Sequence, residues 1–179
     1  MSGQPDDRIL VEAAQDGDVA AFEAIVRRHQ PAVYRVGLRM LGSPADAQDV
    51  TQETFVRAWR SLGRFRRDSA VSTWLYRIVT RRCLDVLSAR HPTDVLEDED
   101  PEMLGPGPAE SLEQRERLRA VSRAIVGLPA DQRAALVLRE FEGLSYERLA
   151  EVLNTSVPAV KGRIHRARLG VLKQTATWR

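Results

Sequence analysis

Apolar residues recur every three to four positions through most of the chain, a spacing that predicts α-helices. No stretch shows sustained alternation of apolar and polar residues between turn residues, the pattern expected of β-strands. We therefore expect an all-α fold. The predicted helices cover about 6–16, 19–41, 43–62, 71–90, 112–127, 130–141, 145–153 and 156–174.

Residues that favour helix ends mark several of these boundaries. Gly42 predicts a left-handed C-terminal cap, and Ser43 followed by Pro44 predicts the start of the next helix. Asn154 is placed to adopt a left-handed conformation between the last two helices. Pro31 lies inside an otherwise helical stretch, where it removes a backbone donor, so we expect it to bend or interrupt that helix.

The segment 91–111 differs in composition from the rest of the chain. It holds four prolines and two glycines, and every charged residue in it is acidic. Like charges repel and proline opposes a helix, so this composition predicts a flexible linker. The linker would join two small helical domains, an N-terminal one over 1–90 and a C-terminal one over 112–179.

Charge is unevenly distributed along the chain. The net charge is +3 over 1–90, −8 over 91–114 and +7 over 115–179, which gives the overall +2. No acidic residue follows Glu151. The basic C-terminal part indicates nucleic acid or another polyanion as a partner.

Cysteine content and hydropathy narrow the cellular setting. The single cysteine, Cys83, excludes an internal disulfide, and we expect it to be a buried structural residue. No apolar run approaches the roughly 18–20 residues that a membrane span needs. The N-terminus lacks the basic and apolar regions of a secretory signal. We expect a cytoplasmic protein.

The last two predicted helices form a helix-turn-helix pattern, a short helix and a longer basic one joined by a tight turn. In the longer helix the apolar residues share one stripe and the opposite side faces outward. The expected contacts with base edges are Lys161, His165 and Arg166. The expected phosphate contacts are Thr155, Ser156, Arg163 and Arg168, and small or rigid residues that allow close approach to a groove are Pro158, Ala159 and Gly162.

The alternative for this helix is an ordinary solvated surface face. Against it, we expect no acidic residue to pair with the basic side chains of this helix, because none follows Glu151. The positive end of the helix dipole also lies at the end where phosphate contacts are expected. We therefore favour a DNA-binding helix.

Two long stretches resemble a known family. Residues 46–85, "DAQDVTQETFVRAWRSLGRFRRDSAVSTWLYRIVTRRCLD", closely resemble region 2 of bacterial sigma factors of the extracytoplasmic-function (ECF) group. Residues 128–172, "LPADQRAALVLREFEGLSYERLAEVLNTSVPAVKGRIHRARLGVL", resemble region 4 of the same group. The resemblance implies a dissociable initiation subunit that binds core RNA polymerase, directs it to the −35 and −10 promoter elements and helps to melt the −10 element.

The resemblance also assigns partners. It implies contacts with the β′ clamp helices and the β subunit of core polymerase, with promoter DNA, and with an anti-sigma factor that is often membrane-anchored. Asp49, Gln52 and Glu53 occupy the motif that grips the β′ clamp helices. Their spacing independently predicts a shared helix face. In the family the linker runs through the polymerase interior; here its acidic charge suits either a nucleic-acid mimic or a soluble spacer.

The loop 63–70 corresponds to the family's specificity loop, which captures a base flipped out of the −10 element. Phe65 offers a stacking face for that base, and the arginines expected to hold the displaced strand are Arg64, Arg66 and Arg67. The following helix would hold the melted strand through Tyr76, Arg77, Arg81 and Arg82. Trp74 is expected in the core, as are Phe55 and Trp59. Arg81 replaces the asparagine usual in the family, which puts the usual base preference in question.

Two other classes of protein compete with this interpretation. A stand-alone helix-turn-helix regulator would explain the C-terminal part but would not need the region 2 motif. An enzyme is disfavoured because the three histidines lie far apart without metal-ligand spacing, and no glycine-rich phosphate loop is present. We expect no catalytic residue, cofactor, metal or small-molecule substrate.

Overall fold

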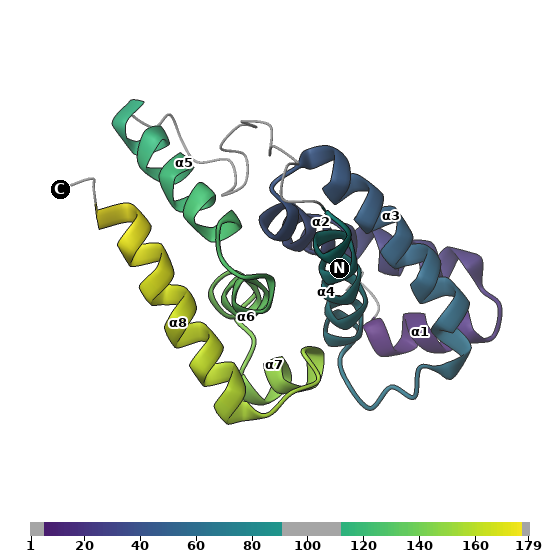
Figure 1. The fold of residues 1–179 in the computed structure, drawn as a ribbon. Coiled ribbons are helices and arrows are strands. Elements are labelled where there is room, and N and C mark those ends of the chain that lie inside the picture. Colours follow the sequence, from purple (N-terminus) through teal and green to yellow (C-terminus); the bar gives the residue numbers. More distant parts are fainter. Residues whose placement is uncertain (1–5, 91–111, 177–179) are drawn as a thin grey trace.

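The structure, a computed structural model, describes residues 6–90 and 112–176, which form helices and their connecting turns (Figure 1). The prediction of an all-α fold is confirmed for these residues, while the predicted linker 91–111 lies outside them. No helix among the described residues is long and apolar enough to span a membrane. The elements are α1 (Asp7–Gln15), α2 (Val19–Leu41), α3 (Pro44–Ser61), a 3-10 turn η1 (Leu62–Arg64), α4 (Val71–Ala89), α5 (Leu112–Val126), α6 (Ala130–Glu140), α7 (Tyr146–Val152) and α8 (Val157–Thr175).

Local capping explains where many of these helices begin and end. Ser43, Ser145 and Ser156 each accept a hydrogen bond from a backbone N–H three residues further on, at 3.2–3.3 Å. Gly42 ends α2 with a φ of 70°, and Asn154 adopts a φ of 47° in the turn before α8. The predicted left-handed positions are therefore confirmed.

The expected interruption at Pro31 does not occur. α2 runs continuously from Val19 to Leu41, with Pro31 exposed near its middle. Proline removes the donor that would bond the carbonyl of Arg27, and Arg27 lies on the exposed side of the helix. Packing of α2 against α1, α3 and α4 offsets the lost bond.

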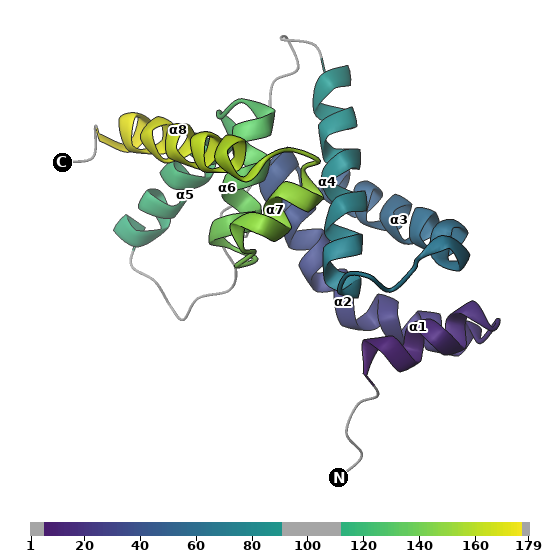
Figure 2. The ribbon, with the colours of Figure 1, turned by 90° about the horizontal axis from the view of Figure 1, so that it is seen from below.

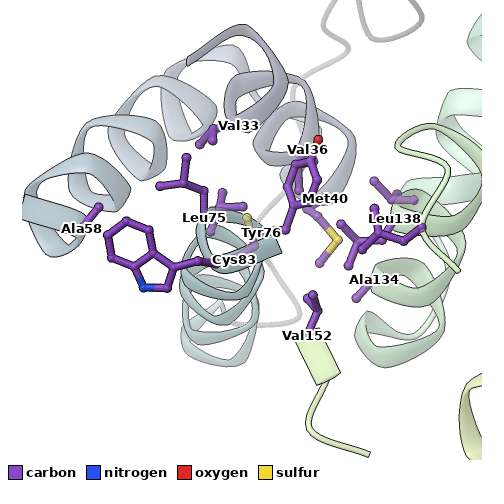
Figure 3. Packing of buried hydrophobic residues seen from close by; sticks show 14 of the residues in the cluster. Val33, Val36, Met40, Ala58, Leu75, Tyr76, Cys83, Ala134, Leu138 and Val152 are labelled. Carbon is purple, nitrogen blue, oxygen red and sulfur yellow. The ribbon is translucent and has the colours of Figure 1, made fainter. Parts of the chain in front are cut away.

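The N-terminal bundle, α1–α4, is built around α2. Ile25, Val33 and Val36 of α2 are fully buried, in one cluster with Leu75 and Val79 of α4 (Figure 3). Burying each such side chain contributes about 1.5–3 kcal/mol. This core leaves the outer surfaces of α3 and of the loop 63–70 available for binding.

The C-terminal bundle, α5–α8, has α6 at its centre, and α8 crosses α5 and α6 (Figure 2). The predicted apolar stripe of α8 faces inward, because Val160, Ile164 and Ala167 are buried. α8 passes so close to the turn between α5 and α6 that a Cβ at Gly170 would lie 2.7 Å from Leu128 Cδ2. α8 is thereby fixed with one defined face outward.

The two bundles contact each other, with α2 and α4 against α6 and α7. A single buried cluster extends across the junction, and Figure 3 shows its members Met40, Tyr76, Cys83, Ala134, Leu138 and Val152. Arg133 of α6 is also buried there and donates to the carbonyl oxygens of Met40, Val126 and Leu128. Burial lowers the pKa of Arg133 to about 10.

Cys83 is fully buried, as predicted, and burial raises the pKa of its thiol to about 12. At pH 8 we expect the folded protein to react with a disulfide reagent at least about a hundredfold more slowly than the denatured protein, because the thiolate is the reactive form. Thiol titration by absorbance measures this ratio. Equal rates in the two states would contradict the burial.

The same raised pKa makes stability depend on pH. The stabilising contribution of the protonated thiol is complete below the unfolded value, near 9, and is lost as pH rises toward 12. The free energy of unfolding should therefore fall less steeply over this range in Cys83→Ala than in the unchanged protein. Denaturant titrations at several pH values provide the comparison.

Candidate nucleic-acid interface

The outward face of α8 carries the side chains that we expected at base edges. Lys161, His165 and Arg166 are all exposed, as is Pro158 in the first turn. The Arg166 guanidinium lies over Gly162, where an added Cβ would be 3.3 Å from Nη1. A larger residue at Gly162 would therefore displace Arg166 as well as crowd a DNA groove.

The residues at the start of α8 would allow DNA to approach the helix closely. Ala159 and Thr155 are half-buried and Ser156 is exposed, with its hydroxyl accepting from the backbone N–H of Ala159. Lys161 Nζ lies 5.3 Å from the centroid of the Tyr146 ring of α7. The first helix of the helix-turn-helix, α7, thus holds one of the outward basic side chains through a cation–π contact.

Two other cations of α8 have acidic partners, contrary to expectation. Arg163 Nε lies 3.3 Å from Asp131 Oδ2, and Arg168 Nη2 donates to Glu140 Oε1 at 2.6 Å. The hydrogen bond to Glu140 raises the pKa of Arg168. Both carboxylates come from α6, so a search for acidic residues within α8 could not find them.

The stacking face of Phe65 is occupied in this conformation. Phe65 is 8% exposed, and its ring stacks on Trp74 with centroids 4.5 Å apart and planes inclined by 16°. Trp74 is buried, as predicted. A flipped base could stack on Phe65 only after the Phe65 ring leaves Trp74.

Gln15 of α1 also holds the loop in place. Its Nε2 donates to the carbonyl oxygens of Leu62 and Phe65, both at 2.9 Å. Sequence reasoning missed this residue, because nothing in the sequence of α1 indicates a contact nearly fifty positions away. Gln15 is a positioning residue for the loop.

The three loop arginines differ in their surroundings. Arg64 and Arg66 are exposed. Arg67 has a φ of 59°, and its Nη1 lies 2.7 Å from Glu12 Oε1 on α1. The hydrogen bond from Arg67 lowers the pKa of Glu12. Arg67 therefore ties the loop to α1 as Gln15 does.

In α4 the structure buries Tyr76, which we expected to contact the −10 strand. Both Trp74 and Tyr76 are buried, although residues two apart point to different sides of a helix. The loop covers one side of α4 and the C-terminal bundle covers another, so neither ring reaches solvent. The side chains of Arg77 and Arg81 are exposed, and Arg81 lies 3.9 Å from Asp85.

The proposed polymerase-docking motif shares one face of α3, as its spacing predicted. Asp49 and Gln52 are exposed, and Glu53 is half-buried because it accepts two hydrogen bonds from Arg82 of α4. These hydrogen bonds raise the pKa of Arg82. The structure thus joins a residue expected to bind polymerase to one expected to hold DNA.

The aromatic residues of α3 divide between core and surface. Phe55 is buried, as predicted. Trp59 is 42% exposed, so its expected place in the core is wrong, although it packs on Phe22 with centroids 4.9 Å apart. Trp59 of α3 therefore packs against α2 while part of its ring stays open to solvent.

A polar cluster between the bundles was also missed by the sequence analysis. The Tyr76 hydroxyl donates to Glu142 Oε2 at 2.7 Å, and Arg39 Nη1 lies 3.6 Å from Glu142 Oε1. Burial, with this hydrogen bond, raises the pKa of Tyr76, while burial lowers the pKa of Arg39. The only sequence signal was an arginine, Arg39, in an apolar stretch.

The described residues offer little for metal chemistry. Within 6–90 and 112–176, no three His, Cys, Asp or Glu side chains gather as metal ligands would. His29 instead contacts Asp7, with His29 Nε2 2.8 Å from Asp7 Oδ2. This contact joins α1 to α2.

Comparisons with known proteins identify the family. Residues 25–92 match the family model of sigma-70 region 2, and residues 118–169 match that of sigma-70 region 4. The RNA polymerase sigma-H factor of Pseudomonas aeruginosa is 42% identical over 97% of this chain and 95% of its own length. The ECF RNA polymerase sigma-E factor of Escherichia coli K12 is 42% identical over 94% of this chain and 93% of its own.

Solved structures share the fold. CnrH, solved in complex with the cytosolic domain of CnrY, superposes with a TM-score of 0.73 at 30% identity, over 96% of this chain and 97% of that one. The sigma factor RpoE of Bartonella quintana, solved with the anti-sigma factor NepR, has a TM-score of 0.70 at 24% identity, over 90% of this chain and 100% of that one.

An all-helical chain whose two bundles match regions 2 and 4 is built as an RNA polymerase sigma factor. Within that class, the chain belongs to the ECF group. It therefore acts in transcription initiation, as the subunit that directs RNA polymerase to promoters. A stand-alone helix-turn-helix regulator is not favoured, because such a protein would not account for region 2.

Gln15 gives a direct test of how the loop is held. In Gln15→Ala the carbonyls of Leu62 and Phe65 lose their shared donor, so backbone amides of 62–70 should exchange with solvent about tenfold faster, as loss of about 1.4 kcal/mol of local stability implies. Hydrogen exchange followed by mass spectrometry measures the rates. Gln30→Ala, an exposed substitution on α2, is the control. Unchanged loop protection in Gln15→Ala would refute the positioning role.

Proposed function

We propose that the two bundles divide promoter recognition between them. The N-terminal domain, 1–90, docks on core polymerase through α3 and binds the −10 element through the loop 63–70 and α4. The C-terminal domain, 112–179, reads the −35 element with α8. The observation that carries this proposal is the outward face of α8, where Lys161, His165 and Arg166 are exposed on a capped helix.

Within α8 we assign two kinds of contact. Lys161, His165 and Arg166 contact base edges, because they lie on the outward face. Residues at the helix start and flanks bind phosphate, which positions the helix without reading sequence. Arg163 and Arg168 belong to this second group, and their α6 carboxylates hold them along the edge of the face.

The N-terminal contacts follow the same division. Asp49, Gln52 and Glu53 form a polar stripe suited to the β′ clamp helices. The displaced −10 strand is held by the basic side chains Arg64, Arg66, Arg67, Arg77, Arg81 and Arg82. Phe65 and Tyr76 join these contacts after their present partners release them.

We further propose that this sigma factor performs no covalent chemistry and needs no cofactor. We expect it in the cytoplasm, where core polymerase and promoter DNA are its partners, and under the control of an anti-sigma factor. The complex of the related CnrH with the cytosolic domain of CnrY supports such a partner. The apolar groove lined by Val121, Leu136, Phe141 and Leu172 is a candidate contact for the β subunit.

The docking assignment is tested with core RNA polymerase. Asp49→Ala and Gln52→Ala should each weaken binding to core polymerase about tenfold, because each removes a polar group of the shared face. Fluorescence anisotropy measures the affinity, and run-off transcription on a promoter library measures specific initiation. Gln30→Ala, an exposed glutamine on α2, is the control. If the unchanged protein supports no specific initiation with core polymerase, the proposed function is wrong.

Base and phosphate contacts are separated by varying the −35 element. In the holoenzyme, His165→Ala and Arg166→Ala should flatten the preference among −35 sequences, with losses of about 1–3 kcal/mol on the preferred one. Arg168→Ala should weaken open-complex formation on all sequences alike and reduce its salt dependence. Arg27→Ala, exposed on the N-terminal bundle, is the control. Equal losses across −35 variants for all three substitutions would refute the assignment.

A further inference from the structure

Glu142 lies in the turn between α6 and α7, yet its side chain is only 5% exposed. It projects from the C-terminal bundle to the N-terminal one, where it accepts from the Tyr76 hydroxyl and lies 3.6 Å from Arg39 and 4.0 Å from Arg35. The neighbouring Phe141 ring packs under Arg39, whose guanidinium carbon is 4.2 Å from the ring centroid. One short turn thus contacts both α2 and α4.

The same junction covers part of the surface that we assign to the −10 strand. Tyr76 is 8% exposed because the C-terminal bundle lies over it. A cavity of about 580 Å³ is lined both by the loop, including Arg67 and Asp68, and by Arg148 and Glu151 of α7. α7 therefore lies next to the loop that would receive a flipped base.

This arrangement cannot read both promoter elements at once. Elements centred near −35 and −10 are about 25 base pairs apart, or roughly 85 Å at 3.4 Å per base pair. A compact chain of 179 residues has a radius of gyration of about 16 Å and a diameter on the order of 40 Å. The 21 residues of 91–111 can extend to at most about 70 Å, so covalent geometry allows the bundles to separate.

The junction has the character of a reversible contact. Arg39 Nε and Nη1 and Glu142 Oε1 make no hydrogen bond with any described residue, although all three atoms are buried. Buried charges that are only partly satisfied contribute little net stability, but removing one partner leaves the other uncompensated. Beside the buried apolar cluster and Arg133, Glu142 therefore acts on whether the bundles stay together more than it adds to the stability of either bundle.

We propose that Glu142 is an autoinhibitory latch: in the free sigma factor it holds the C-terminal bundle over Tyr76 and the −10 loop, and promoter binding requires this contact to open. The proposal rests on the proposed function for the identity of the covered surface. In this proposal the free factor adopts the closed form through its own C-terminal domain, without a second protein. Any partner that binds the closed form would add to a contact already present.

The first test measures closure without polymerase or promoter. Donor and acceptor dyes are placed on Gln30→Cys and Lys173→Cys, both exposed positions, in a Cys83→Ala background, because Cys83 lies at the junction that should open. Glu142→Ala should lower the closed-to-open ratio at least tenfold, seen as a shift to low transfer efficiency in single-molecule measurements. Glu147→Ala, an exposed acidic residue in the same bundle, is the matched control. Unchanged transfer efficiency in Glu142→Ala overturns the proposal.

The second test asks whether closure blocks DNA. When the closed state dominates, apparent affinity scales with the open fraction, so Glu142→Ala should bind a single-stranded −10 oligonucleotide about tenfold more tightly. Arg39→Met removes the other partner and should act in the same direction, with a double variant that is not additive. Thermal unfolding checks that each variant is folded. Equal oligonucleotide affinity in folded wild type and variants overturns the proposal.

A transcription assay distinguishes failure of the latch proposal from failure of the proposed function. With saturating core polymerase, the Glu142→Ala factor and the unchanged one should initiate at similar rates, because the holoenzyme form is already open. Specific initiation by both, without any shift in dye transfer or oligonucleotide binding, would refute the latch and leave the sigma function standing. A dye-transfer shift without specific initiation by either would refute the proposed function and keep the latch as a conformational contact.

Discussion

The buried guanidinium of Arg133 fixes the centre of this molecule. It donates to carbonyls at the ends of two helices, Met40 near the end of α2 and Val126 at the end of α5, and to Leu128 in the turn that follows. Helix ends leave carbonyls without intrahelical partners, and a five-donor cation can serve several of them at once. No carboxylate is among these contacts, so carbonyl dipoles compensate part of the buried charge, and Arg133 Nε makes no hydrogen bond with any described residue. The two bundles therefore pack against each other at the carbonyl groups that Arg133 binds.

Several of the basic side chains that we assign to DNA are held by carboxylates. Arg67, Arg82 and Arg168 each pair with a carboxylate from another element, and these pairs are partly exposed. Exposed ion pairs contribute only about 0–1 kcal/mol and weaken with salt. Such a carboxylate holds an arginine in place while a phosphate can replace it at little cost. These three carboxylates therefore keep part of the proposed binding surface ordered in the absence of DNA.

Much of the fold could be predicted from the sequence because its signals are local. Helix caps at Ser43 and Ser156, the left-handed Asn154 and the inward stripe of α8 depend on residues a few positions apart. The features that the sequence did not predict have a common cause, which is contact between residues far apart in the chain. Tyr76 is buried only because another bundle lies on it, and Arg168 finds its partner on α6. The α3 stripe was predictable from spacing, whereas the positioning role of Gln15 requires three-dimensional proximity.

The contact between Gln15 and the loop has a consequence for how promoter preference can diverge. Gln15 precedes residue 25, where the match to sigma-70 region 2 begins, yet it donates to the carbonyls of the first residue of η1 and of the residue that follows η1. Natural variation in α1 can therefore alter the rigidity of the loop that we propose captures a base, without altering any residue of the family motif. Two sigma factors with identical loops can then tolerate different bases at the same promoter position, and a comparison restricted to the motif would miss the reason.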